Sequence, residues 1–217
     1  MLIRKFSPFV IFLLLAPNMV SVYGQQKVDI DLALANDPEL FTGNFSRVGI
    51  GFSRSNFNYG TAVDGMVLNP LHMSLDFGKR MNRNFGAYFT VTGDLLLREK
   101  SFGVDWLNSW IQAGMHVGGL FYIMGGNSYF APEIGVDILS FEYVEYQVTP
   151  SENPLCAGLG SSLKYGYDIH LSGKIFLGGQ LYISYAYTWE TGTPGTVQSP
   201  VANSFIYGAA INLKFGK

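Results

Sequence analysis

The sequence has few charged residues and only one cysteine, and both shortages restrict the kind of protein it can be. Cys156 is alone, so the chain cannot form an intramolecular disulfide. Charged residues make up 14% of its 217 residues, whereas about 25% is usual in soluble domains, which need them to cover a surface in contact with water. The formal net charge is only −2, which argues against nucleic acid as a partner.

Long apolar runs are also missing from most of the chain. After the N-terminal segment, no stretch approaches the about 18 consecutive apolar residues of a membrane-spanning helix. That segment combines a basic start at Arg4 and Lys5, an apolar core over 10–15 and small or tolerated residues at 22–24. It therefore predicts a cleavable signal peptide over 1–24. An uncleaved anchor is disfavoured, because a proline and an asparagine interrupt the apolar run.

Aromatic residues and glycine are abundant instead. Aromatics reach 15% of the chain, and there are 26 glycines. An exported protein that is poor in charge, rich in aromatics and without a spanning helix is typical of a β-barrel embedded in a membrane. The sequence therefore predicts an integral protein of the bacterial outer membrane.

Apolar and polar residues alternate strictly along much of the chain, as in "LHMSLDFGKRMNRNFGAYFTVTGD" at 71–94. Alternation with a period of two residues indicates a strand with one apolar face. Most of these segments are long enough to cross a bilayer at a tilt, which takes about 9–11 residues. Eight segments alternate, two of them within the quoted stretch, and the other six lie at 46–54, 110–123, 129–141, 158–171, 175–189 and 204–215.

The connections between these segments alternate in length, which indicates the topology. Long connections lie near 55–65, 98–109, 142–157 and 190–203, and short ones at 79–84, 124–128 and 172–174. Outer-membrane barrels have short periplasmic turns and longer extracellular loops. We therefore expect an all-β fold over 45–217, an eight-stranded antiparallel up-and-down transmembrane β-barrel with four longer extracellular loops. A soluble sandwich gives no reason for every second connection to be long.

Residues 25–44 lie outside this scheme. Val28, Ile30, Leu32 and Leu34 alternate with polar residues, as in another short strand. A ninth strand would place the two termini on opposite sides of the membrane, so we favour a periplasmic arm. The alternative, in which the segment enters the mouth of the barrel, stays open.

Aromatic residues gather toward both ends of the apolar stripes. The set beside the short turns is Phe77, Phe85, Phe121, Phe130 and Phe215, and the set toward the long loops is Tyr185, Tyr187, Trp189, Phe205 and Tyr207. Aromatics favour strands in general, but clustering at both ends predicts the two interfacial girdles of a membrane barrel.

The inward side of the predicted strands carries charged residues that can pair inside the barrel. Hairpins centred near residues 61 and 150 would place Arg47 across from Asp76, Asp137 across from Lys164, and Glu133 across from Asp168. We expect such pairs to fill and rigidify the lumen, and a gated polar pore is the alternative. A Glu133–Asp168 pair would bring two like charges together. The candidate lumen network is Arg47, Asp76, Glu133, Asp137, Lys164 and Asp168, with Asp94 on the same face.

Other residues give weaker signs of chemistry. The spacing of His170 and Ser172 matches the His-x-Ser pair of lipid A deacylases, but Ser172 falls in a predicted periplasmic turn, away from the outer leaflet. His72 and His116 lie on different strands without metal-ligand spacing. No catalytic residue, cofactor or metal is therefore predicted. One predicted loop is acidic and would suit divalent cations or a basic partner, with Glu142, Glu145 and Glu152.

The closing segment, "FIYGAAINLKFGK", together with the alternation and the rhythm of the loops, resembles the small eight-stranded outer-membrane barrels typified by OmpX and the transmembrane domain of OmpA. The resemblance covers about 45–217 and is architectural. It implies contact with outer-membrane lipids and assembly by the barrel-assembly machinery, which recognises a terminal aromatic residue. Here Phe215 is followed by two further residues.

The function expected from these observations is non-catalytic. A barrel with a filled lumen would contribute to envelope structure, or would present its loops to an envelope or extracellular protein partner. Two alternatives stay open. One is a small porin-like pore or conduit for ions or apolar ligands, and the other is a lipid A-modifying enzyme.

Overall fold

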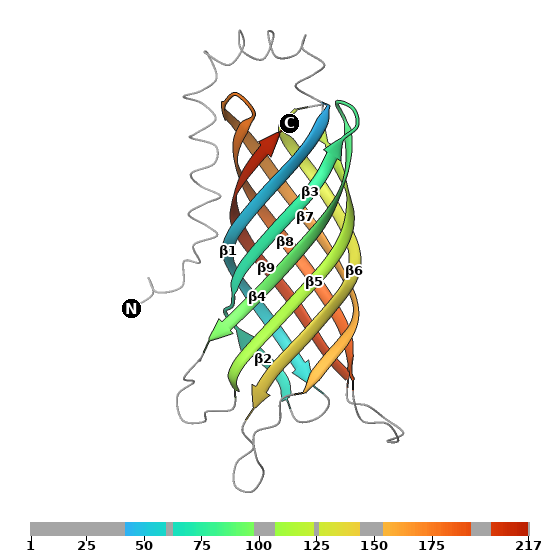
Figure 1. Ribbon diagram of the computed structural model, residues 1–217. Helices are drawn as coiled ribbons and strands as arrows, with labels where there is room; N and C mark the ends of the chain where they lie inside the picture. Colours follow the sequence, from blue (N-terminus) through green and yellow to red (C-terminus); the bar gives the residue numbers. More distant parts are fainter. Residues whose placement is uncertain are drawn as a thin grey trace, which may run out of the picture. The chain divides into compact units, whose positions relative to one another are not determined.

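The chain folds into a closed antiparallel β-barrel (Figure 1). The structure, a computed structural model, describes residues 42–59, 63–97, 107–123, 126–143, 154–191 and 201–216. Within these ranges no helix is long and apolar enough to span a membrane, a finding that concerns helices alone. The strands are β1 (Gly43–Tyr59), β2 (Val63–Leu68), β3 (Leu71–Arg80), β4 (Phe85–Leu97), β5 (Leu107–Tyr122), β6 (Ser128–Tyr143), β7 (Leu155–Ser172), β8 (Ile175–Glu190) and β9 (Val201–Gly216).

These nine strands occupy eight positions in the wall, because β2 and β3 both pair with β1. The two pairings share one register from Met66 to Arg80, and the register shifts between Phe57 and Tyr59. Between β2 and β3 lies Pro70, which has no N–H to donate to a ladder. Its carbonyl oxygen still accepts a hydrogen bond from the Ser53 N–H at 3.1 Å. Pairing of β1 with β9 closes the ring. The predicted eight-stranded antiparallel barrel is therefore confirmed.

The strands are longer than the alternation predicts. β1 starts at Gly43, rather than near residue 45, and runs to Tyr59. β2 begins within the connection predicted at 55–65 and extends beyond it to Leu68. β6 and β7 likewise extend into the connection predicted at 142–157. The predicted signal peptide, nearly all of the predicted arm at 25–44, and the predicted loop residues Glu145 and Glu152 lie outside the described residues.

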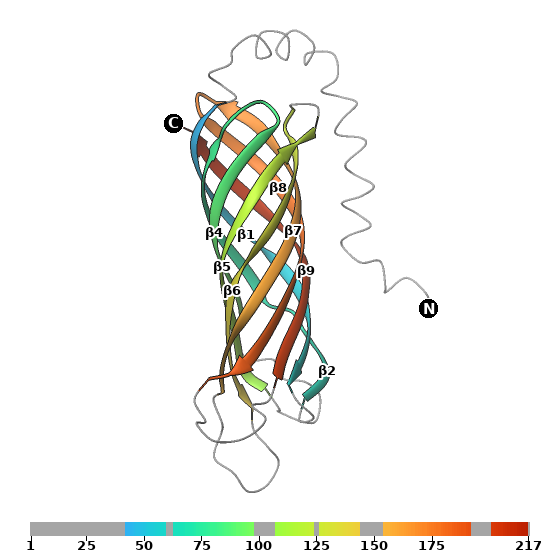
Figure 2. The same cartoon turned by 90° about the vertical axis from the view of Figure 1, so that its right-hand side faces the viewer.

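The stagger of the strands sets the width of the barrel. A path of paired residues that starts at Val48 and passes once round the wall returns to β1 at Asn58, ten residues further along. The strands are accordingly tilted, as Figure 2 shows. A tilt of about 35–45° is common in barrels. Eight strands at such a tilt enclose a space just wide enough for side chains to fill.

An apolar band surrounds the middle of the barrel. Outward-facing residues there are large, apolar and exposed, such as Ile211, with 64% of its surface accessible. We call this set the apolar band. Its members include Val48, Ile50, Phe52, Met73, Leu75, Val91, Ile111, Met115, Val117, Ile134, Val136, Ile138, Leu159, Leu163, Ile183, Ile211 and Leu213.

The aromatic residues predicted to form girdles lie at the two margins of this band. All of them except Phe85, which is half-buried, are exposed on the outer face. Phe85 packs beside Phe121, with ring centroids 5.4 Å apart. An apolar exterior with aromatic margins is the surface expected of a protein in contact with hydrocarbon.

Toward the ends of β1, β5 and β6 that lead to the long connections, the polarity of the two faces inverts. On β1 the outward-facing Asn56 and Asn58 flank Phe57, which is buried in the lumen. The strands therefore continue beyond the apolar band with polar residues outside and apolar residues inside, as in a water-soluble barrel. The same inversion is seen on neighbouring strands, with Ser109 beside the inward Trp110 on β5 and Ser140 between the inward Leu139 and Phe141 on β6.

Replacing Ile211, within the apolar band, by arginine tests whether hydrocarbon covers that band. Ile211→Arg is expected to lower the free energy of unfolding in lipid vesicles by about 2–4 kcal/mol, the cost of arginine near the middle of a bilayer. Urea titration of the refolded protein measures it.

The matched control is Asn56→Arg, which places the same side chain outside the apolar band. It should cost about 0–1 kcal/mol, the range for positions near the bilayer surface. Equal losses for the two variants would contradict a membrane-embedded band.

Candidate functional site

The lumen is the interior space enclosed by the described strands, and side chains fill it in three layers. We describe the layers from the short-turn end, where β3–β4, β5–β6 and β7–β8 connect, to the long-loop end. Each layer is built by inward-facing residues of several strands, since alternate residues of a strand face opposite sides.

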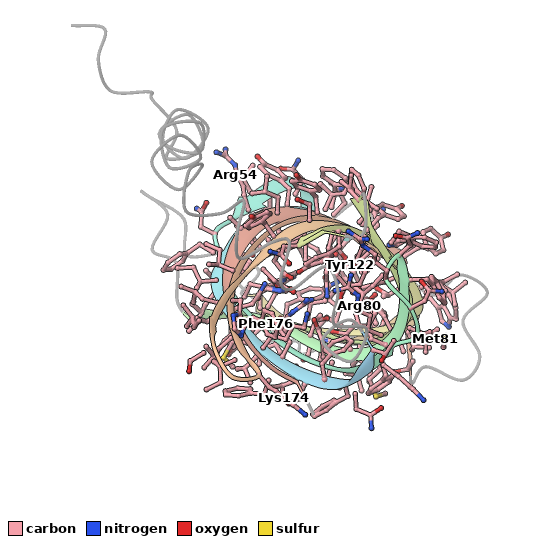
Figure 3. The ribbon with its side chains drawn as sticks, turned by 90° about the horizontal axis from the view of Figure 1, so that it is seen from above. Arg54, Arg80, Met81, Tyr122, Lys174 and Phe176 are labelled. Atoms are coloured by element: carbon pink, nitrogen blue, oxygen red, sulfur yellow. The ribbon has the colours of Figure 1, made fainter. Side chains whose placement is uncertain are left out.

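Cations stacked on aromatic rings form the first layer, at the short-turn end. The Arg80 guanidinium carbon lies 3.6 Å from the centre of the Tyr122 ring, and Lys214 Nζ lies 4.8 Å from the centre of the Phe176 ring. Figure 3 shows Arg80, Tyr122 and Phe176 within the ring of strands at this end. Such cation–π contacts stabilise both groups where water is scarce. The buried apolar and aromatic residues of this layer are Phe45, Tyr88, Leu120, Tyr122, Tyr129 and Ala131.

An ionic network forms the second layer. Arg47 bridges two carboxylates, with Nη1 lying 3.3 Å from Asp76 Oδ2 and Nη2 lying 3.2 Å from Asp168 Oδ2. Asp168 Oδ2 is also 2.9 Å from Lys214 Nζ. All four side chains are nearly or fully buried. Residues from β1, β3, β7 and β9 therefore meet in one cluster.

Lys164 continues the network on the facing wall. Its Nζ lies 2.6 Å from Glu133 Oε1 and 3.7 Å from Asp76 Oδ1. Glu133 also accepts hydrogen bonds from the hydroxyl groups of Tyr88 and Ser162. A buried charge is tolerated only when it is paired and hydrogen-bonded, and Glu133 meets both conditions.

The charges of the ionic network balance. Three cations face three carboxylates within contact distance, so this part of the lumen has no net charge to attract or transport an ion. The cations are Arg47, Lys164 and Lys214, and the carboxylates are Asp76, Glu133 and Asp168.

Two histidine–carboxylate pairs lie between the ionic network and the long-loop end. His116 Nε2 lies 3.1 Å from Asp137 Oδ2, and the Gln112 amide donates a hydrogen bond to Asp137 Oδ1 at 3.2 Å. Through its other ring nitrogen, His116 lies 3.6 Å from Glu133, which joins this pair to the ionic network. The second pair joins His72 Nδ1 to Asp94 at 3.1 Å, and the Ser53 hydroxyl group donates to the same carboxylate at 2.9 Å.

An apolar cap forms the third layer, at the long-loop end. Its centre is an aromatic group in which the Phe141 ring lies 4.9 Å from Phe57 and 4.8 Å from Tyr59, measured between centroids. Trp110 packs edge-on against Phe57 at 6.4 Å. Phe57 and Trp110 are completely buried. The apolar cap consists of Phe57, Tyr59, Leu68, Leu96, Trp110, Leu139, Phe141, Cys156, Tyr182, Ala202, Ile206 and Ala210.

The predicted network residues all lie in the lumen, but only one of the three predicted cross-strand pairs forms. Arg47 pairs directly with Asp76, as predicted. The pairs Asp137–Lys164 and Glu133–Asp168 are wrong, and the like-charge contact does not exist. In the β6–β7 hairpin Glu133 is opposite Ser162, six residues from its predicted partner, and Asp137 is opposite Gly158.

This error has a simple physical cause. Alternation repeats every two residues, so a shift of the pairing by any even number leaves every side chain on the same face. The pattern therefore placed Glu133, Asp137 and Lys164 inside but gave no information on register. Lys214 was missed as a network member although its inward position on the last strand follows from the same alternation. The other contacting residues that the prediction left out are neither lysine, arginine nor carboxylates: Tyr88, Thr90, Gln112, His116 and Ser162.

The candidate pair His170 and Ser172 lies apart from the lumen network. Ser172 is exposed in the β7–β8 turn, and His170 Nε2 lies 2.8 Å from the Gly173 carbonyl oxygen. The two residues are thus at the short-turn end, where the sequence placed them. His72 and His116 are each paired with a carboxylate. Among the described residues, no group of three potential ligands is arranged to hold a metal ion.

Two solved structures have a similar fold. Neisserial surface protein A matches with a TM-score of 0.54 at 8% sequence identity, over 81% of this chain and 97% of that protein. Ail, the attachment invasion locus protein of Yersinia pestis, solved in complex with the heparin analogue sucrose octasulfate, matches with a TM-score of 0.51 at 15% identity, over 78% of this chain and 99% of Ail. No protein-family model and no curated protein matches the sequence.

Asp168→Asn tests the ionic network. The change leaves Arg47 and Lys214 buried without their shared carboxylate, so we expect the free energy of unfolding to fall by about 3–5 kcal/mol. Adding Lys214→Met should recover part of this loss, because Arg47 keeps Asp76 as a partner whereas Lys214 is left without a carboxylate. Denaturant titration in detergent micelles or vesicles measures both variants.

The matched control is Glu142→Gln, the same chemical change on a half-buried outward-facing residue. It should alter stability by no more than about 0.5 kcal/mol. If the losses from Asp168→Asn and Lys214→Met simply added, the two residues would not be coupled and the network would be refuted.

Proposed function

We propose that this chain, which has the fold of small eight-stranded outer-membrane barrels, is an integral outer-membrane protein with a sealed lumen. Its work is non-catalytic: it contributes to envelope structure and presents its long loops to a protein partner. The short turns face the periplasm and the long-loop end faces outward. Residues 1–24 direct export, and the segment from residue 25 to the start of β1 forms a periplasmic arm.

The filled lumen is the observation that supports a sealed barrel. A conducting pore needs a continuous file of water, whereas this lumen holds stacked cations and rings, a charge-balanced network and an apolar cap in succession. The ionic network offers no unpaired charge of either sign to draw an ion inward. The cap adds a layer in which an ion would lose its hydration without any compensating ligand.

The apolar cap also supports a second candidate function, a conduit for apolar ligands. Its residues are apolar and lie at the long-loop end, where such a ligand would enter. Against this, the rings of Phe57, Phe141 and Trp110 pack on one another, so a ligand would have to displace them. We therefore rank the conduit below the sealed barrel.

A lipid A-modifying enzyme fits less well. In the proposed orientation His170 and Ser172 lie on the periplasmic side, whereas lipid A occupies the outer leaflet. His170 contacts a backbone carbonyl oxygen in its own turn.

The partners of the proposed barrel are outer-membrane lipids along the apolar band, the barrel-assembly machinery during biogenesis and a protein that contacts the loops.

Planar-bilayer recording tests the sealed lumen. The reconstituted protein should show no steady conductance, because three packed layers separate its two ends. A folded sample is verified by gel migration that changes on boiling. A steady conductance that disappears when Asp137 or Lys164 is altered would contradict the sealed lumen and favour the polar pore.

Affinity purification from native membranes in mild detergent tests the role of the loops. We expect a stoichiometric envelope protein to co-elute, and replacement of residues 144–153 by a short Gly-Ser linker should abolish this. The control variant is Arg83→Ser, which alters a short turn at the other end of the barrel. A barrel that elutes alone would exclude a stable envelope partner. The remaining candidates for contact with the loops would then be surfaces outside the cell.

A further inference from the structure

The short-turn end presents exposed cations without any exposed carboxylate among the described residues. Lys79 and Arg83 lie at the β3–β4 connection, and Lys174 lies at the β7–β8 connection. All three are exposed. The carboxylates in this half of the barrel, such as Asp168, are buried and paired inside the lumen. Among the described residues, the outer surface of this end therefore carries only positive charge.

The apolar exterior continues to the tips of the same turns. Met81, between the strands β3 and β4, has 52% of its surface exposed. Leu171 and Ile175 are exposed on either side of the β7–β8 turn. This differs from the long-loop end, where the outward residues of β1 turn polar while the strand is still paired. The cations at the short turns thus lie at the margin of the apolar surface, at the depth of lipid headgroups.

Local hydrogen bonds hold the β3–β4 turn in one shape. Asn82 Oδ1 accepts hydrogen bonds from the N–H groups of Asn84 and Phe85, both at 2.8 Å. Arg80 turns inward onto Tyr122 and donates to the Arg83 carbonyl oxygen at 2.5 Å. Arg80 therefore stabilises the turn from the inside, and the exposed charges of this turn belong to Lys79 and Arg83.

The β7–β8 turn is equally compact. Gly173 has a φ of 54°, a left-handed conformation that glycine adopts without strain. Lys174 is the last residue before β8. The backbone carbonyl oxygen of Lys174 accepts a hydrogen bond from the Gly216 N–H at 2.7 Å. Both turns therefore present their cations from defined backbone positions.

We propose that Lys79, Arg83 and Lys174 form a basic collar that binds the phosphate groups of anionic phospholipids in the leaflet facing the short turns. The proposal rests on the proposed function, since it requires the apolar band to lie in a bilayer. Each cation near an anionic membrane surface strengthens binding by about fivefold at low salt, and three by on the order of 100-fold.

The distribution of the collar favours lipid over an acidic protein as the occupant. In Figure 3, Lys174 and Met81 lie on different sides of the ring, so the cations belong to separate turns. A protein partner would need a contiguous patch on one side. Lipids surround the whole barrel, so cations spaced along the rim each meet a different headgroup.

The experiment compares lipid retention by the full-length mature barrel and a triple variant, Lys79→Gln with Arg83→Gln and Lys174→Gln. Each protein is refolded into vesicles of equal parts phosphatidylcholine and phosphatidylglycerol, extracted gently and analysed by native mass spectrometry. We expect wild type to retain phosphatidylglycerol preferentially. The triple variant should lose most of that preference, and 1 M salt should weaken it in wild type, as screening requires.

Arg54→Gln is the matched control, because Arg54 is an exposed cation toward the other end of β1. It should keep the wild-type preference. An unchanged preference in the triple variant, an equal loss with Arg54→Gln, or no preference in wild type would each overturn the proposal. Failure of wild type to insert into pure phosphatidylcholine vesicles, judged by gel migration before and after boiling, would instead refute the proposed membrane function.

Discussion

Closure of the wall is the constraint on which the other features depend. Hydrocarbon offers no hydrogen-bond partners, so a sheet within it must pair all its backbone groups internally and leave no edge. Here β1 pairs with β3 on one side and β9 on the other. The ten-residue stagger needed for closure tilts the strands and fixes a narrow interior, so every inward side chain must find room and a partner among the others.

The narrow interior explains why the charges in the lumen are paired. Arg47 reaches Asp76 on the adjacent strand and Asp168 across the barrel, because the opposite wall is within the length of its side chain. Lys164 spans a similar gap between Asp76 and Glu133. In a wider barrel these groups would be solvated separately. The network therefore follows from the width of the barrel as much as from its residues, and it connects strands that are distant in the sequence.

The two ends of the barrel are built for different surroundings. At the short-turn end the apolar exterior reaches the turns, and cations sit at its margin. At the long-loop end β1, β5 and β6 continue with polar residues outside, and an apolar cap fills the inside. Outward-facing side chains meet hydrocarbon on one stretch of a strand and water on the next. The outward residues are therefore apolar on the first stretch and polar on the second. In the proposed membrane orientation, the inversion marks where the wall leaves the bilayer.

The period-two alternation and the lengths of the connections determined the fold class and the topology. The alternation also determined the face of each residue along the apolar band, because neighbouring residues in a strand must point to opposite sides. That was sufficient to place Arg47, Glu133 and Lys164 in the lumen. Only the tertiary structure decided which of them touch, since the register of β6 and β7 depends on the hairpin and on closure of the whole ring. It also decided that Phe57 and Trp110 form an internal cap. An alternating sequence does not state which face is the inside once the strand has left the membrane.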